Sequence, residues 1–480
     1  MNSPTSRRRA SGLIAASTGL GILFSGMGGG AAVAAEPFPD ADIVREYPSN
    51  VSYPYESIMD SFNVLRNDTA IVAQNDATTV TINRSASPEQ VERAIVDQYA
   101  DMSVSIADGL GSNLGAIYTA GRADGELPKV QALLAKSGGL IGYHSSSNPS
   151  KEYFSYDRPY IRFADELIYR DKRGGDAWDS TSGAFPSGHT SQAYWQGTAL
   201  AVMLPELAPQ IMARTSEAGH NRVVMAAHYP LDVMSGRMMG NHIVERRLTD
   251  AEFRPLIEAA AAELREFLEV ECGNALDVCI ASDTPYLSDE ASLSIYEDRM
   301  TYGFPQVGAA GQPVTVPANA ESLLLTSHPQ LTGDQRRQVL ALTAIDSGYP
   351  LDGENTVAGW QRLNVAAAMA AEVVVNADGS VSLAIDAAPV PVPDPTVPTD
   401  PGTSPADPGA TPGDPAVTPG EPSIPEESNE VATPVADQNR SADGLANTGA
   451  QSPFAGVLAA VLALFAGAGL LVGRHRAALK

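Results

Sequence analysis

Residues 186–204 read PSGHTSQAYWQGTALAVML, and this stretch predicts a helix that begins at an anion-binding turn. A Pro-Ser-Gly turn that enters a helix exposes several backbone N–H groups at the positive end of the helix dipole. Gly188 lets the backbone approach an oxyanion closely, and the hydroxyl of Ser187 can donate a hydrogen bond to it. His189 is then expected at the rim of this turn. The alternative is an ordinary helix cap with an incidental histidine.

A second histidine lies between a basic and an acidic residue, in the order Arg222, His228 and Asp232. Pro230 predicts that a helix begins there, with His228 at its mouth and Asp232 in its first turn. A carboxylate bonded to one imidazole nitrogen fixes the tautomer and leaves the other nitrogen to face a substrate. An ordinary structural His–Asp pair is the alternative interpretation.

A third cluster stands upstream, where Lys151 is followed after six residues by Arg158-Pro159. Taken alone, such a pair near a helix start is most often solvated surface. Together, in this order and spacing, the three clusters resemble the signature of the type 2 phosphatidic acid phosphatase superfamily. That superfamily also holds the bacterial class A acid phosphatases and the vanadium haloperoxidases.

The resemblance implies a mainly α fold, a helical bundle of the acid phosphatase/vanadium haloperoxidase type, with a smaller mixed C-terminal subdomain. It implies that His228 is the nucleophile, His189 the general acid, and Asp232 the residue that orients His228. The residues that it implies for substrate binding are Lys151, Arg158, Ser187, Gly188, Asn221 and Arg222.

One position departs from the family pattern, which usually has Gly-x-Ser-Arg where this chain has Gly219-His220-Asn221-Arg222. An asparagine amide can still donate a hydrogen bond, so an altered phosphate affinity is expected and not an inactive site. His220 is additional to the pattern and receives no role.

The expected function is hydrolysis of small phosphomonoesters through a phosphohistidine intermediate, without a metal or other cofactor. Three cations can hold the phosphate, because each charge-assisted hydrogen bond contributes roughly 1.5 to 3 kcal/mol. Vanadate would bind the same site as a mimic of phosphate, so a vanadium-dependent haloperoxidase is the nearest alternative. A lipid phosphatase at a bilayer and a non-catalytic, wall-displayed interaction protein are further alternatives.

Both ends of the 480-residue chain predict export. Residues 1–35 combine three arginines, an apolar run and small residues up to Ala35, as a secretory signal peptide does. Residues 445–480 contain the pentapeptide LANTG, the apolar segment 454–473 and a basic tail. They resemble the Leu-Pro-x-Thr-Gly sorting signal of Gram-positive bacteria, which implies that a sortase cuts after Thr448 and joins the chain to the cell wall. A permanent membrane anchor is the alternative.

The remaining chain divides into three parts by composition. A helical phosphatase core is expected over residues 36–280, a C-terminal extension packed on it over 281–387, and a Pro-rich, wall-spanning linker over 388–444. The net charge of −26 argues against nucleic acid as a partner and against contact with membranes other than through the anchor. In a secreted core the cysteines Cys272 and Cys279 are expected to form a disulfide and not a metal site.

Local patterns place the secondary structure of the core. Ser87-Pro88 with Gln90 predicts a capped helix start, and further helices are expected over residues 127–136, 157–170, 191–204, 229–247 and 251–270. Strand-like alternation before residue 300 is confined to short stretches such as 78–82. After Cys279 the chain is expected to be mixed, with helices over residues 332–343 and 357–373.

Overall fold

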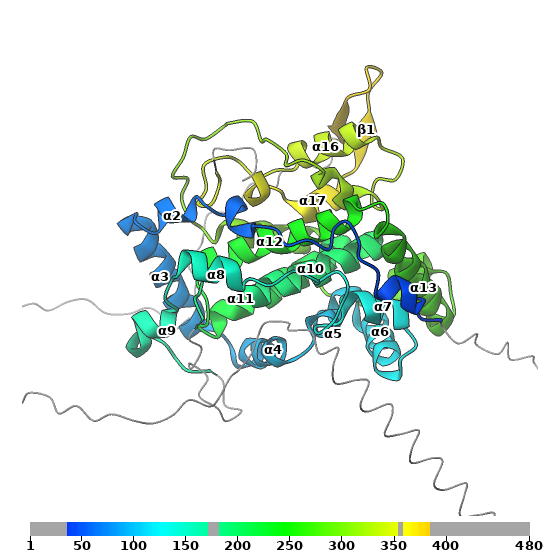
Figure 1. Cartoon of the computed structure of the whole chain (residues 1–480), viewed down its shortest axis with the longest axis horizontal. Coiled ribbons are helices and arrows are strands. Elements are labelled where there is room, and N and C mark those ends of the chain that lie inside the picture. Colours follow the sequence, from blue (N-terminus) through cyan, green and yellow to red (C-terminus); the bar gives the residue numbers. More distant parts are fainter. Residues whose placement is uncertain (1–35, 171–181, 354–358, 385–480) are drawn as a thin grey trace, which may run out of the picture. The chain divides into compact units, whose positions relative to one another are not determined.

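The computed structural model of the chain describes residues 36–170, 182–353 and 359–384 (Figure 1). The predicted signal peptide, linker and sorting signal, including Thr448, lie outside the described residues. The described chain is mainly helical with one small hairpin of strands, so the predicted fold class is confirmed.

The α-helices of the first half are α1 (Asp40–Ile43), α2 (Phe62–Leu65), α3 (Thr69–Ser85), α4 (Pro88–Tyr99), α5 (Met102–Ser105), α6 (Ser112–Asp124), α7 (Pro128–Leu134), α8 (Asn148–Phe154) and α9 (Pro159–Arg162). Those of the second half are α10 (Gly188–Met203), α11 (Ala208–Val224), α12 (Pro230–Thr249), α13 (Arg254–Cys272), α14 (Leu276–Ser282), α15 (Asp289–Thr301), α16 (Gly333–Leu342) and α17 (Val365–Ala370). Short 3-10 helices are η1 (Tyr55–Ile58), η2 (Ala107–Leu110), η3 (Ala164–Glu166), η4 (Pro205–Leu207), η5 (Ala320–Leu324) and η6 (Gly359–Gln361). The strands are β1 (Val373–Val375) and β2 (Val381–Leu383), which pair antiparallel.

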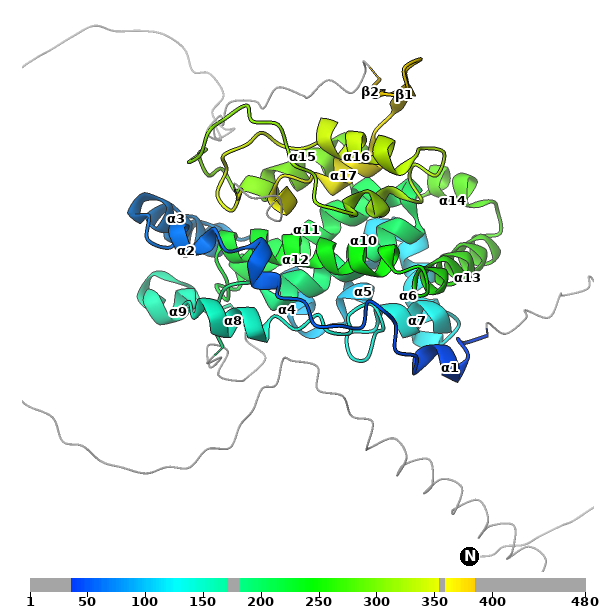
Figure 2. The ribbon, with the colours of Figure 1, turned by 45° about the horizontal axis from the view of Figure 1, so that its top comes forward.

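Three helices form the centre of the core, because α10 packs most extensively on α12 and α11. Helix α10 is buried on nearly every side, consistent with its run of small and apolar residues from 197 to 203. Helices α4 to α7 lie on one side of this trio and α15 to α17 on the other (Figure 2). The central helices carry two of the three sequence clusters at their ends.

A glycine allows α12 to approach the start of α10. A Cβ atom placed on Gly236 would lie 2.7 Å from Cβ of Thr190 and 2.8 Å from the carbonyl oxygen of Ser187. Both distances are too short for real carbon contacts, so only glycine fits here without a shift of one helix. The turn at residues 186–189 is therefore held directly against α12.

The helix start at Ser87 is confirmed, since the Ser87 hydroxyl accepts the N–H of Gln90 in the first turn of α4. Two local expectations are wrong. Residues 78–82 are part of helix α3 and not a strand. The expected helix over 157–170 is limited to α9 and η3, because Phe163, with φ −151° and ψ 48°, leaves the helical conformation and ends α9.

The described part of the C-terminal extension packs on the core helices. Helices α15 and α17 contact α11, and η5 contacts α12. Tyr286 also donates from this region to the carboxylate of Glu217 on α11, at 2.5 Å. Of the helix expected over 357–373, residues 359–361 form η6, 365–370 form α17, and 373–375 are strand β1.

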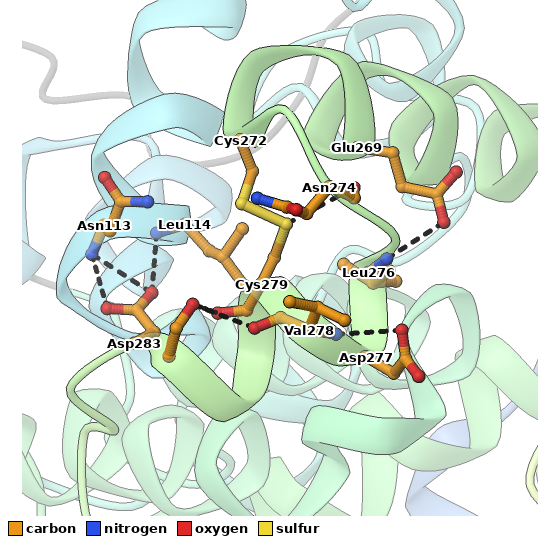
Figure 3. Close-up of a disulfide and its surroundings, with 11 residues drawn as sticks. Asn113, Leu114, Glu269, Cys272, Asn274, Leu276, Asp277, Val278, Cys279 and Asp283 are labelled. Atoms are coloured by element: carbon orange, nitrogen blue, oxygen red, sulfur yellow. Dashed lines mark hydrogen bonds between the residues drawn. A yellow bond between two sulfur atoms is a disulfide. The ribbon is translucent and has the colours of Figure 1, made fainter.

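The structure joins Cys272 and Cys279 in a disulfide with a Cα–Cα distance of 6.3 Å (Figure 3). The bond closes the tight connection between α13 and α14, where Gly273 takes the left-handed conformation that ends α13. Just beyond α14, Asp283 accepts the N–H groups of Asn113 and Leu114 at the start of α6. The disulfide joins α14 to the end of α13, and Asp283 joins the end of α14 to the start of α6.

Within the described ranges, no helix combines the length and the apolar character needed to cross a membrane. The apolar segment 454–473 is not among those ranges.

Candidate active site

The turn at residues 186–189 forms the start of α10. Ser187 is the N-cap residue, and its hydroxyl oxygen accepts the N–H of Thr190 at 3.3 Å and the hydroxyl of Thr190 at 2.8 Å. The backbone N–H of Ser187 donates to the carbonyl of Asp232 at 3.0 Å. Gly188 is half-buried, and a Cβ atom there would lie 2.6 Å from Oγ of Ser147. The turn is thus fixed to α12 and lies against the loop before α8.

His228 lies in the connection between α11 and α12 and is almost completely buried. Its Nδ1 is 3.1 Å from Oδ2 of Asp232, which also accepts the N–H of Tyr229 at 3.0 Å. Its backbone N–H donates to the carbonyl of Arg222 at 3.2 Å. The sequence distance between His228 and Asp232 therefore has the predicted effect: Nδ1 faces the carboxylate and Nε2 faces the other way.

One of the predicted cations, Arg158 at the start of α9, contacts this imidazole, and Lys151 of α8 acts on it electrostatically. Arg158 places one terminal nitrogen 3.3 Å from Nε2 of His228 and 2.8 Å from the carbonyl of Ala227. Its Nε donates to the carbonyl of Ser182 at 2.9 Å, and Nζ of Lys151 donates to the carbonyl of Gly183 at 2.6 Å. Both side chains are buried and anchored by backbone carbonyls, which leaves their positive charges without a carboxylate partner in these contacts.

The third cation, Arg222, is buried at the end of α11. One of its terminal nitrogens donates to Oε1 of Gln98 on α4 at 2.9 Å. Its Nε has no hydrogen-bond partner among the described residues. A buried guanidinium N–H without an acceptor is costly, so this donor favours an anion beside it.

The charges of these residues act on both histidines. Burial, and then the charges of Arg158, Lys151 and Arg222, lower the pKa of His228 well below its usual value. Burial, and then Arg222, Lys136, Arg158 and Lys151, lower the pKa of His189 in the same way. His189 and His228 therefore both lie within the electrostatic influence of Lys151, Arg158 and Arg222.

The charged forms of Lys151 and Arg222 are also less favourable here than in water. Burial and then Arg158 lower the pKa of Lys151 well below its usual range, and the same two causes lower that of Arg222 to about 10. Burial raises the pKa of Asp232 to about 7, against the opposing N–H of Tyr229 and the nearby cations. Among the described residues the site thus holds more positive charge than its carboxylate balances.

The side chain of Asn221 bonds to Asp97 on α4. Its amide nitrogen donates to Oδ2 of Asp97 at 2.8 Å, and Asp97 also binds the guanidinium of Arg214 at 2.7 Å. Both Asp97 and Arg214 are buried between α4 and α11. His220 stacks on Tyr302, with ring centroids 5.9 Å apart, and takes no part in the cluster.

Two residues of the site were absent from the predictions. Lys136 follows α7, is exposed, and contributes to the low pKa of His189. Gln98 on α4 holds Arg222. Neither belongs to a local motif, so only tertiary contacts identify them: α4 packs on α11, and the Lys136 ammonium donates to the carbonyl of Ala100 just after α4. No set of three or more His, Cys, Asp or Glu side chains within the described ranges is arranged to hold a metal ion.

The fold and this geometry define a helical protein with a buried cluster of three cations around His228 and its partner Asp232. Residues 132–245, which include all six clustered residues from Lys151 to Asp232, match the sequence model of the PAP2 superfamily. This match supports a PAP2 superfamily domain at those residues.

Particular relatives agree with that assignment. The acid phosphatase of Zymomonas mobilis is 29% identical over 141 residues, covering 29% of this chain and 52% of the relative. The non-specific acid phosphatase of Salmonella typhimurium is 32% identical over 136 residues, covering 26% of this chain and 48% of the relative. The chain thus spans about half the length of the curated relatives it matches.

Proposed function

We propose that this chain is an acid phosphatase that hydrolyses small phosphomonoesters. The observation that carries the proposal is the excess positive charge around two histidines, with the pKa values of Lys151, Arg158 and Arg222 all lowered. A phosphoryl dianion would supply the missing negative charge, and the unpartnered Nε–H of Arg222 would gain an acceptor. The similarity to acid phosphatases supports the same reaction.

In the first step Nε2 of His228 attacks phosphorus. Its lone pair forms the N–P bond while the bond from phosphorus to the ester oxygen breaks, and His189 gives its proton to the departing alkoxide. Asp232 accepts the Nδ1–H of His228 and stabilises the positive charge that develops on the ring. Lys151, Arg158 and Arg222 surround the equatorial oxygens.

In the second step water replaces the histidine. Neutral His189 removes a proton from water, the oxygen attacks phosphorus, the N–P bond breaks, and inorganic phosphate leaves with His228 neutral again. His189 must be protonated when the ester binds, although its pKa in the empty site is lowered. The bound dianion offsets the cations that lower this pKa, so substrate binding itself favours the acidic form.

The reaction as proposed requires no metal ion. In many phosphoryl-transfer enzymes metal ions neutralise the phosphate oxygens, and here three buried cations would take that role. The role of Asn221 in this scheme is to connect α11 to Asp97, beside the Gln98 that holds Arg222.

Export and wall attachment are part of the proposal. They rest on the sequence of residues 1–35, 388–444 and 445–480. Fractionation of the producing cells tests them: the chain is expected in the muramidase-released wall fraction, with its N-terminus at or near Glu36. Deletion of residues 445–480 is expected to release it into the medium, whereas retention in the cytoplasm would contradict export.

Phosphate release from an aryl phosphate in the presence of EDTA tests the catalytic proposal. Turnover is expected to persist in EDTA, to vanish in His228→Ala, and to fall by about 10² to 10⁴ in His189→Ala on esters with poor leaving groups. His144→Asn is the matched control, because His144 is exposed and its left-handed backbone tolerates asparagine. Halogenation with vanadate and peroxide, without phosphate release, would instead identify a haloperoxidase, and the absence of both activities would favour a non-catalytic protein.

A further inference from the structure

A cavity lies at the other end of α12 from His228. Its volume is about 770 Å³, and its walls include Glu245 and Arg246 of α12, Tyr53 of the N-terminal segment, Arg337 of α16 and Trp360 of η6. Glu245 follows Asp232 by thirteen positions, which corresponds to about 20 Å along the helix. The cavity is therefore separate from the proposed phosphate site.

The charges that line the cavity balance. Its carboxylates belong to Glu245 and Asp250 and its guanidinium groups to Arg246 and Arg337, so the formal sum is zero. Asp250 already accepts the N–H groups of Ser49, Glu252 and Phe253, and Arg337 pairs with Glu321 at 2.6 Å. The net charge of this lining therefore favours neither an anionic nor a cationic ligand, whereas the cations around His228 favour an anion.

Hydrogen-bonding capacity remains on these groups. Arg246 donates to the carbonyl of Val51 at 2.9 Å, and its guanidinium lies 5.3 Å from the ring centroid of Tyr53. Glu245 accepts from Nδ1 of His242 at 2.9 Å and from the Thr249 hydroxyl at 2.9 Å. A guanidinium with five donors and a carboxylate with about four acceptor positions can each bind further neutral hydroxyl groups.

Aromatic rings complete the lining. The buried ring of His242 lies between Tyr53, at 4.5 Å between centroids, and Trp360, at 4.9 Å. With Nδ1–H directed to Glu245, its Nε2 is an acceptor, and it has no partner among the described residues. Aromatic surface combined with a few fixed polar groups is typical of small-molecule sites of this volume.

We propose that this cavity binds an uncharged carbohydrate of one to three sugar units. Sugar hydroxyls donate to Glu245 and accept from Arg246, while the apolar faces of the sugar rings pack on Tyr53. The balanced charge distinguishes this ligand class from phosphate esters and from ammonium compounds. The proposal does not depend on the phosphatase activity.

Saturation-transfer NMR on the purified protein tests the proposal. The probes are glucose, galactose, mannose and N-acetylglucosamine with their di- and trisaccharides, each at about 10 mM, a concentration that reveals millimolar affinities. At least one series is expected to bind, with an affinity unaffected by NaCl, because a neutral ligand is not screened. Absence of binding across the panel overturns the proposal, as does preferential binding of inorganic phosphate or tetramethylammonium that competes with the sugars.

Variants of the cavity locate the binding. Arg246→Met is expected to weaken the affinity about ten- to a hundredfold, the loss of one or more charged hydrogen bonds. Tyr53→Ala is expected to weaken it as well, and it serves if Arg246→Met fails to fold. Arg265→Met removes a guanidinium paired with Glu206 outside the cavity and should leave binding unchanged. Hydrolysis of the aryl phosphate should be unchanged in all three; sugar binding that survives both cavity variants overturns the assignment.

Discussion

At the scale of single residues, the protonation of His228 decides whether it can act as a nucleophile. A free imidazole with its usual pKa near 6.5 is almost entirely protonated at pH 5. Burial and three neighbouring cations make protonation of His228 less favourable in the folded protein. The nucleophile therefore stays neutral into the acidic range, which suits an acid phosphatase.

This shift predicts how the His228 ring titrates. Since the pKa of His228 is lowered, its imidazole should stay neutral at pH 5, where an imidazole with the usual pKa would be about 97% protonated. The measurement is the ¹⁵N chemical shifts of the His228 ring against pH, because the rate itself also depends on the carboxyl of Asp232, whose pKa is raised to about 7. Protonation of the His228 ring with an apparent pKa at or above 6.5 would show that burial and the cations do not act on this group.

Asn221 has two competing interpretations, as a ligand of phosphate and as a structural partner of Asp97, and a substitution distinguishes them. The signature suggests a phosphate ligand, whereas its amide nitrogen donates to buried Asp97. Asn221→Ala should therefore lower the free energy of unfolding by about 1 to 3 kcal/mol, because Asp97 loses a donor, and change KM by less than about threefold. Denaturant titration and steady-state kinetics check this; a KM raised tenfold with unchanged stability would support direct substrate binding.

At the scale of elements, the active-site turn depends on how closely α10 and α12 approach. Gly236→Ala would place a Cβ atom 2.7 Å from Thr190, so the two helices must separate. We expect a loss of about 1 to 3 kcal/mol in stability and a marked fall in kcat, because the Ser187–Asp232 contact is disturbed.

Gly333→Ala is the matched control for this change. A Cβ atom at Gly333 meets only Cγ of Glu321, at 3.9 Å, so stability and kcat should be retained. Equal behaviour of the two variants, by thermal unfolding and aryl phosphate turnover, would contradict the account of the helix contact.

The sequence predicted elements with clear local signals and missed those set by tertiary contacts. Helix α4 has a capping serine and Pro88 at its start, and its position was predicted. Helix α11 was not predicted, because buried polar residues such as Arg214 and Glu217 interrupt any apolar face and are paired only in the fold. Helix α3 was mistaken for a short strand in part, since Thr78, Val80 and Ile82 alternate with polar residues.

In the candidate site, too, the residues with local motifs were found from the sequence and those set by tertiary contacts were missed. The motifs singled out Lys151, Arg158, His189, Arg222 and His228, and in the fold the charges of the three cations act on both histidines. They could not predict Gln98 or Lys136, which reach the cluster from α4 and from the end of α7. The partner of Asn221 was equally hidden, since Asp97 is more than one hundred residues away in sequence.

At the scale of the whole molecule, local and total charge have opposite signs. The chain carries a net charge of −26, yet the cluster around His228 is cationic. The C-terminal extension contributes to this arrangement, because Tyr286 bonds to Glu217, which pairs with Arg93 and lies beside Arg214. These contacts extend to Asp97 and Asn221, so the extension supports the end of α11 that bears Arg222.

The central claim is that the N–P bond forms on His228. The direct measurement is rapid acid-free quenching of the protein during turnover of an aryl phosphate, followed by peptide mass spectrometry under alkaline conditions that preserve phosphohistidine. The account predicts one phosphoryl group on the peptide that contains His228, accumulation of this species in His189→Ala with a good leaving group, and none in His228→Ala. A phosphoryl group on another residue, or full turnover in His228→Ala, would contradict it.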